Sequence, residues 1–242
     1  MNRGEEIAAR LADVRARIAA AAAAAGRAAG DVTLIAVSKK MPPDDVAAAI
    51  AAGQLDFGEN YAQELRDKRA AIDAAAATGS TSGAARWHFI GPLQANKVKY
   101  VAGKVALLHT IDSIELLDEV ARRTPAGATQ QCLVQVNVAG EARKHGVAPG
   151  ELPALLDRFG AHEQMRCAGL MLIPPLGEAA EASRPHFAAL RALRDAERAR
   201  PRANVDLVHL SMGMSHDLEV AIAEGTTLVR VGTAIFGERA AR

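Results

Sequence analysis

Short apolar runs alternate with helical segments along almost the whole chain, and this alternation most constrains the fold. We count about eight strand–helix units after a leading helix. The predicted strands cover 32–39, 55–59, 87–91, 105–111, 131–138, 165–173, 205–210 and 227–231. The predicted helices cover 7–25, 42–50, 61–72, 94–101, 114–123, 151–159, 180–199 and 216–223. This α/β pattern is typical of a (β/α)8 TIM barrel, and an open doubly wound sheet is the alternative.

The composition fits one domain without a charged partner surface. The chain has 242 residues, half of them apolar, so we expect 1–242 to bury a single core. Lys and Arg number 29 and Asp and Glu 28, with no basic stripe, which argues against nucleic acid as a partner. Charges interrupt the first 17 residues and no apolar run could span a bilayer. We therefore expect a cytoplasmic protein that does not bind membranes, as a monomer or weak homodimer.

The cysteines and histidines show no metal-binding pattern. Cys132 and Cys167 lie in predicted strands without a Cys-x-x-Cys motif, so we expect reduced core thiols. His88 and His209 lie in predicted strands and could support a site, although such histidines are more often structural. The others have no metal-ligand spacing: His109, His145, His162, His186 and His216. We predict no metal.

The first apolar run ends on a lysine, Lys39. Ligands of α/β folds bind outside the carboxyl ends of strands, so Lys39 can face a site while apolar neighbours surround its stem. Burial disfavours the ammonium form and leaves a nucleophilic amine. A surface lysine that closes a strand is the alternative, and it is the more frequent case for such a residue taken alone.

The loops after the last two predicted strands carry glycine and hydroxyl residues. One loop contains Ser211 and Ser215, and the other contains Gly232 and Thr233. Barrels often bind a phosphate at these loops through backbone N–H groups. A turn in which Ser215 caps the next helix explains the first loop equally well, but two such loops at adjacent strand ends favour an anionic ligand.

Arg230 lies two residues before Gly232, on the same face of the last predicted strand. A buried arginine needs a partner, so this position predicts either a ligand or an acidic neighbour in a structural ion pair.

Three segments carry a resemblance to a known family: WHFIGPLQANK at 87–97, SMGMSHD at 211–217 and VRVGTAIFG at 229–237. They resemble the pyridoxal phosphate homeostasis proteins, over nearly the whole chain. That family is similar to the N-terminal barrel domain of alanine racemase, which implies the same barrel here, with an extra N-terminal helix. An alanine- and serine-rich segment at 74–85 lies outside the motifs, and we expect a mobile loop there without a function.

The resemblance also implies the cofactor and its ligands. It implies pyridoxal 5′-phosphate (PLP), bound as an aldimine on Lys39 rather than on the neighbouring Lys40. It implies phosphate contacts at Ser211, Ser215, Gly232 and Thr233, Arg230 at the pyridine nitrogen, and Asn60 beside the ring.

The family resemblance implies a binding protein that takes part in intracellular PLP homeostasis, and not an enzyme. We expect the cofactor, and vitamers or amino acids that exchange with it, as the small-molecule partners. Two-base racemization needs a second acid/base, a tyrosine of a C-terminal domain in alanine racemase. The sequence ends at Arg242 without such a domain, and Tyr61 and Tyr100 fall in predicted helices as packing residues. A low-activity amino-acid racemase is the alternative, and a Schiff-base aldolase acting on a sugar phosphate is a third interpretation.

Overall fold

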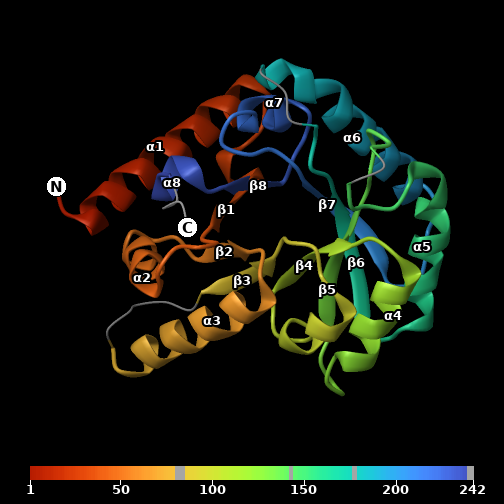
Figure 1. Cartoon of the computed structure of the whole chain (residues 1–242). Helices are drawn as coiled ribbons and strands as arrows, with labels where there is room; N and C mark the ends of the chain where they lie inside the picture. Colours follow the sequence, from red (N-terminus) through yellow and green to blue (C-terminus); the bar gives the residue numbers. More distant parts are fainter. Residues whose placement is uncertain (80–84, 142–143, 176–178, 239–242) are drawn as a thin grey trace.

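The computed structural model describes residues 1–79, 85–141, 144–175 and 179–238, and in this part of the chain eight parallel strands close into a barrel (Figure 1). The strands are β1 (Thr33–Val37), β2 (Asp56–Glu59), β3 (Arg86–Phe89), β4 (Leu107–Ile111), β5 (Gln130–Gln135), β6 (Met165–Met171), β7 (Val205–Ser211) and β8 (Leu228–Val231). Each strand pairs with its neighbours in sequence, and β8 pairs with β1, which places Ile35 beside Arg230. The predicted closed barrel is confirmed, and the open sheet is wrong.

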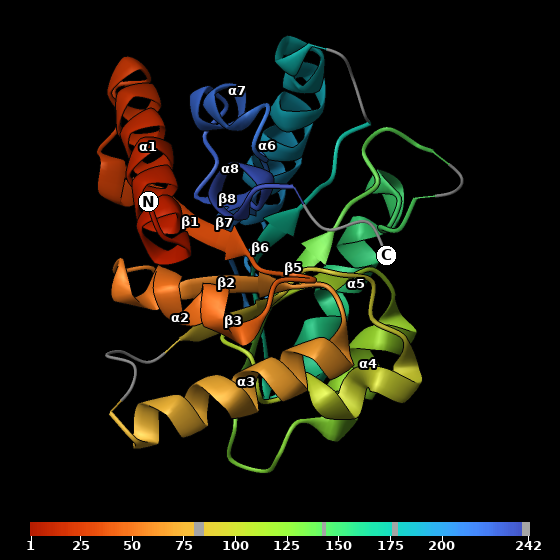
Figure 2. The same cartoon turned by 60° about the vertical axis from the view of Figure 1, so that its left-hand side comes forward.

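The helices surround the barrel on the outside (Figures 1 and 2). They are α1 (Arg3–Ala24), α2 (Pro43–Ala51), α3 (Ala62–Ala77), α4 (Ile114–Arg123), α5 (Leu152–Arg158), α6 (Arg184–Arg198), α7 (Leu218–Ala223) and α8 (Thr233–Phe236). The helix after the last strand, α8, has four residues, too few to cover a strand of the barrel. Helix α1 contacts α2, α7 and α8 and so completes the ring of helices beside β1 and β8.

Helix α1 forms because its sequence carries both a start signal and an apolar face. Asn2 accepts a hydrogen bond from the Glu5 amide, and the Glu5 side chain accepts one from the Asn2 amide, which is a capping box. Its buried residues recur at helical spacing: Ile7, Leu11, Val14, Ile18 and Ala22. This apolar face belongs to the larger core cluster, in agreement with the prediction of a leading helix that packs.

Two predicted helices differ from the observed ones. The segment 94–101 forms a 3-10 helix, Ala95–Tyr100, because only Val98 of these six residues is buried, too little to stabilise a longer helix. The segment 180–199 is divided into a 3-10 turn, Ala180–Ser183, and α6. Pro185 lies in the first turn of α6, where its missing N–H is harmless, but it disfavours a continuous helix through the residues before it.

The predicted mobile segment at 74–85 overlaps a helix. Residues 74–77 belong to α3, because alanine has the highest helix propensity and extends the helix beyond the predicted end. Residues 80–84 lie outside the described residues, so the expectation of mobility there stays a prediction.

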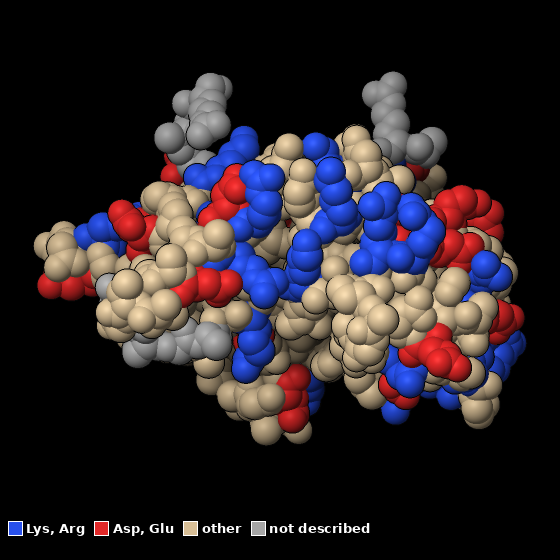
Figure 3. Space-filling model, turned by 90° about the horizontal axis from the view of Figure 1, so that it is seen from below, with Lys and Arg blue, Asp and Glu red and all other residues tan. Residues whose placement is uncertain are grey.

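The core has two apolar clusters. The larger lies between the strands and the helices and includes Cys132 and Cys167, which are buried free thiols as predicted. The smaller lies inside the barrel, and its residues are Ile35, Leu107, Leu133, Ala168, Met171 and Leu228. On the face seen in Figure 3, Lys and Arg side chains are interspersed with Asp and Glu, in keeping with a net charge of +1. None of the described helices is long and apolar enough to cross a bilayer.

Candidate cofactor-binding site

A cavity of about 290 Å³ lies at the carboxyl ends of β1, β2 and β8, the end of a barrel at which active sites occur. It is lined by Val37, Lys39, Asn60, Ile90, Ile173, Met214, Ser215, His216, Arg230, Gly232 and Thr233. The structure thus brings six of the seven predicted site residues together. The seventh, Ser211, is fully buried and does not line the cavity.

Lys39 lies in the turn that follows β1 and forms part of the cavity wall. Lys40 lies outside the cavity. Its backbone has a φ of 63°, and its amide donates to Glu64 Oε1 over 2.5 Å, which stabilises this left-handed conformation. The reversal of the chain at Lys40 explains why two adjacent lysines face different surroundings.

A buried ion pair that the sequence did not indicate holds this turn. Lys68 Nζ donates to the Ser38 carbonyl over 2.7 Å, to Glu59 Oε1 over 2.6 Å and to Glu64 Oε1 over 2.9 Å. The Ser38 hydroxyl donates to the same Glu59 oxygen over 2.6 Å. Burial raises the pKa of Glu59, and Lys68 and Ser38 oppose that effect. Hydrogen bonds and an ion pair therefore hold the ends of β1 and β2 together directly beside Lys39.

The loops after β7 and β8 converge on the opposite wall of the cavity. Among the described residues, the amides of Ser215, Gly232 and Thr233 have no hydrogen-bond acceptor. Ser215 does not cap a helix that begins at 216, because α7 begins at Leu218 and Asp217 Oδ1 accepts from the Met214 amide within this loop. Residues 215–217 do form the turn of the alternative interpretation, but its capping by Ser215 is wrong, and the unpaired amides form a cradle suited to an anion.

Arg230 is buried on β8 and lines the cavity. Its guanidinium donates to Ser211 Oγ over 2.6 Å and to the Leu172 carbonyl over 2.8 Å. No described carboxylate forms an ion pair with it, so the structural ion pair is not the explanation for this arginine. Burial lowers the pKa of Arg230 to about 10, although Asp217 opposes the effect.

Asn60 follows β2 and presents an unsatisfied acceptor. Its buried Oδ1 has no hydrogen-bond partner among the described residues. The Asn60 backbone lies so close to Gly91 that a Cβ on Gly91 would be 2.2 Å from the Asn60 carbonyl oxygen. Gly91, whose position at a strand end and within a motif was visible in the sequence, does not line the cavity, but the lack of a side chain there allows Asn60 to keep its place.

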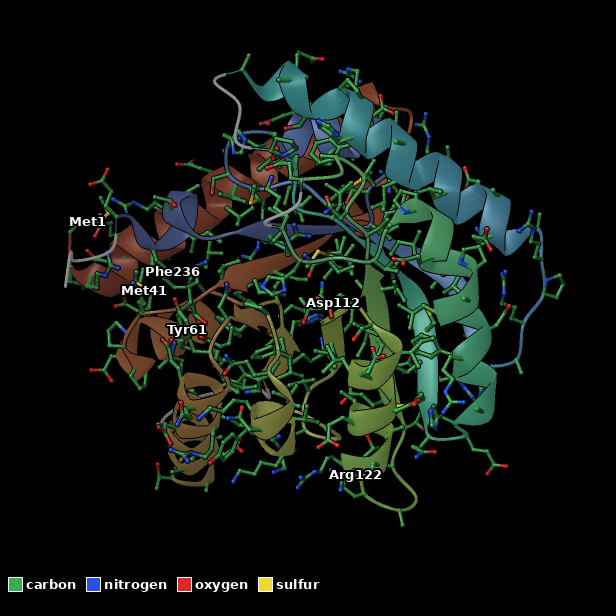
Figure 4. The ribbon with its side chains drawn as sticks, turned by 45° about the vertical axis from the view of Figure 1, so that its right-hand side comes forward. Met1, Met41, Tyr61, Asp112, Arg122 and Phe236 are labelled. Atoms are coloured by element: carbon green, nitrogen blue, oxygen red, sulfur yellow. The ribbon has the colours of Figure 1, made fainter. Side chains whose placement is uncertain are left out.

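The two tyrosines considered as a second base lie away from the cavity. Tyr61 was predicted to lie in a helix, but it precedes α3 with extended backbone, and its side chain is half exposed (Figure 4). Tyr100 ends the 3-10 helix, with Arg66 and Lys99 over its ring. Neither tyrosine lines the cavity. The described residues also contain no cluster of three His, Cys, Asp or Glu able to hold a metal ion. The absence of a metal itself stays a prediction.

These residues suit one kind of ligand. An amine, an anion cradle, a buried arginine without a carboxylate and an unsatisfied amide oxygen surround one cavity, which fits a small planar anion with an electrophilic carbon. Residues 10–240 match the family model of the alanine racemase N-terminal domain, so the barrel belongs to that class.

Comparison with known proteins narrows this class. The pyridoxal phosphate homeostasis protein of Pseudomonas aeruginosa is 45% identical over 236 residues, which is 96% of each chain. The protein of the same name from Aquifex aeolicus is 43% identical, covering 95% of this chain and 97% of its own. The structure of PipY from Synechococcus elongatus with PLP bound is 34% identical, with a TM-score of 0.81, covering 96% of this chain and 100% of PipY. The chain belongs to the pyridoxal phosphate homeostasis protein family.

Proposed function

We propose that this chain binds PLP in the cavity between β1 and β8, holds it through a covalent bond to Lys39, and buffers its concentration without turning over a substrate. The observation that carries the proposal is the meeting of Lys39 and the Ser215, Gly232 and Thr233 amide cradle in one cavity. The structure of PipY with PLP bound supports the choice of ligand.

Each group in the cavity has a distinct task in this proposal. PLP would supply a reactive aldehyde, and Lys39 is the residue whose amine would hold it covalently. The three amides would donate hydrogen bonds to the phosphate oxygens, and Asn60 Oδ1 would accept a hydrogen bond from the ligand. Ser211, which is buried below the cavity, contributes through Arg230 and not by direct contact with the phosphate.

Arg230 makes the bound cofactor a poor electron sink. A guanidinium remains protonated and can only donate, so a ring nitrogen that faces Arg230 is unprotonated. Racemases share this feature, and the distinction depends on the second acid/base. Neither tyrosine that could serve lines the cavity, which supports binding over racemization.

A spectrum of the purified protein tests the covalent bond. We expect a yellow protein whose colour is lost on treatment with borohydride, and peptide mass mapping that finds the reduced adduct on Lys39. Lys39→Ala should lose the adduct, whereas the matched Lys40→Ala variant should keep it. An adduct on another lysine would contradict the proposal, and a colourless protein with a reducible sugar phosphate adduct would favour the aldolase.

A chirality assay separates buffering from racemization. We expect the PLP-loaded protein to leave L- and D-alanine and L- and D-serine unchanged. Saturable interconversion of the enantiomers that disappears in Lys39→Ala would show that the protein is a racemase and would contradict the buffering function.

A further inference from the structure

A chain of buried polar side chains crosses the interior of the barrel and ends at Arg230. Asp56 Oδ1 lies 3.1 Å from His88 Nε2, and His88 Nδ1 lies 3.0 Å from His109 Nε2. His109 Nδ1 lies 2.9 Å from Ser211 Oγ, which accepts from Arg230. All five residues are buried, and they come from β2, β3, β4, β7 and β8.

When both imidazole rings are neutral, the two ends of this chain fix the direction of every hydrogen bond in it. Asp56 is ionised, because Arg86 and His88 lower its pKa to about 2 despite its burial, so it only accepts. A neutral His88 then carries its proton on Nε2 and accepts at Nδ1, and a neutral His109 donates from Nε2 and accepts at Nδ1. At the other end, Arg230 only donates, so Ser211 accepts from it and gives its own proton to His109.

The surroundings of His109 favour its neutral form, in which one ring nitrogen donates and the other accepts. Burial lowers the pKa of His109 well below 6.5, and the nearby Arg230 guanidinium lowers it further. A neutral imidazole has one donor and one acceptor, and both are used in the chain. The Ser211 hydroxyl then has its hydrogen directed at His109 and its lone pairs directed at the guanidinium.

We propose that His88 and His109 are positioning residues of the cofactor site, which fix the Arg230 guanidinium through the Ser211 hydroxyl. The proposal rests on the proposed function, in which Arg230 faces the pyridine nitrogen of PLP. Arg230 has neutral acceptors and no ion pair among the described residues, so its orientation depends on how these acceptors are held. The Asp56 carboxylate, at the start of β2 and so at the opposite mouth of the barrel, anchors the chain.

The protonated nitrogen of each ring can be measured without cofactor. We expect long-range proton–nitrogen NMR of the labelled protein at pH 7 to find Nε2 protonated and Nδ1 unprotonated in both rings. Assignment comes from the signals lost in His88→Gln and His109→Gln. A proton on Nδ1 of either ring would overturn the proposal.

Variants of His109 test whether the chain acts on the cofactor. Leucine removes both hydrogen bonds, and we expect about tenfold weaker PLP binding, the loss that one charge-assisted bond implies. Glutamine keeps one acceptor and one donor, so His109→Gln should bind within about threefold of the wild type on the same affinity scale. His209→Leu is the matched control, since His209 bonds to Thr227 outside the chain, and it should leave the affinity unchanged.

A double variant separates positioning from a general loss of structure. If His109 acts through the serine, His109→Leu combined with Ser211→Ala should bind PLP no more weakly than Ser211→Ala alone. Additive losses, or a His109→Leu variant with wild-type affinity, would overturn the proposal. A wild-type protein without a Lys39 adduct would overturn the proposed function instead. The ring tautomers would still decide whether the hydrogen bonds run from Ser211 to Asp56 as proposed.

Discussion

Asp56 has the most strongly shifted pKa of the acidic side chains in the barrel interior. Burial alone would raise its pKa, but hydrogen bonds from Arg86 and His88 outweigh burial and lower the value from 3.8 to about 2. A carboxylate whose pKa is lower in the folded state stabilises the fold above its unfolded pKa. That contribution is lost as the pH falls from about 4 through about 2.

The consequence is a pH-dependent stability that one substitution removes. Asp56 should contribute about 2 kcal/mol at pH 7, of which about 1 kcal/mol is lost by pH 3. Urea denaturation at a series of pH values checks this, with Asp56→Asn as the comparison. The difference in unfolding free energy between wild type and variant should shrink below pH 5, and a constant difference would contradict the assignment.

Gly91 is the second residue whose identity the structure explains. Gly91→Ala would place a Cβ against the Asn60 backbone, which cannot yield as a flexible side chain could. We expect a loss of about 2–3 kcal/mol of stability and weaker PLP binding, because the strain displaces Asn60.

Gly30→Ala is the matched control for Gly91. A Cβ at Gly30 meets no atom within 4 Å, and the variant should keep both properties. Thermal unfolding and PLP titration compare the two variants. Equal behaviour would show that the contact with Asn60 is unimportant.

At the scale of elements, the ion pair between α3 and β2 holds the turn that carries Lys39. Lys68→Met would leave Glu59 charged, buried and without its main partner, which costs about 3–5 kcal/mol. The variant should also form the Lys39 adduct more slowly, because the Ser38 carbonyl loses its donor. Denaturation and the rate of colour formation on adding PLP measure the two effects.

The neighbouring Arg69 offers a control on the same helix. Its ion pair with Asp73 is exposed, so Arg69→Met should change stability by no more than about 0.5 kcal/mol. A double variant, Lys68→Met with Glu59→Gln, should recover part of the loss by removing the buried charge. Failure to recover would place the defect outside the ion pair.

Apolar runs and the rule that sites lie at carboxyl strand ends predicted the barrel and most of the cavity. Lys39, Asn60 and Arg230 could be predicted because each lies at or just after the end of a strand, and the apolar runs in the sequence show where those strands end. Lys68 was missed, because a lysine in a helix reads as solvent-exposed, and its burial depends on where Glu59 lies on another element. His109 lay in a correctly predicted strand, but its contact with Ser211 spans 102 positions and exists only once the barrel has closed.

At the scale of the whole molecule, the two thiols report on the integrity of the barrel. Cys132 and Cys167 are adjacent on β5 and β6, and burial raises the pKa of both, that of Cys167 to about 12. Since the thiolate is the reactive form, a thiol reagent should label neither cysteine in the folded protein. Labelling should follow global unfolding in urea. Labelling of one thiol well before the unfolding transition would reveal local opening of these strands.

Helix α1 joins the beginning of the chain to its end. Arg3 donates to the Phe236 carbonyl, 233 positions away, and Arg17 pairs with Glu219 across 202 positions. During synthesis α1 therefore leaves the ribosome long before α7 and α8 exist, and the part of its surface that contacts them stays uncovered. Contacts of such large separation are formed late and slowly. The barrel can close only after β8 and α8 have been translated, and until then its unpaired strand edges and apolar surface favour aggregation.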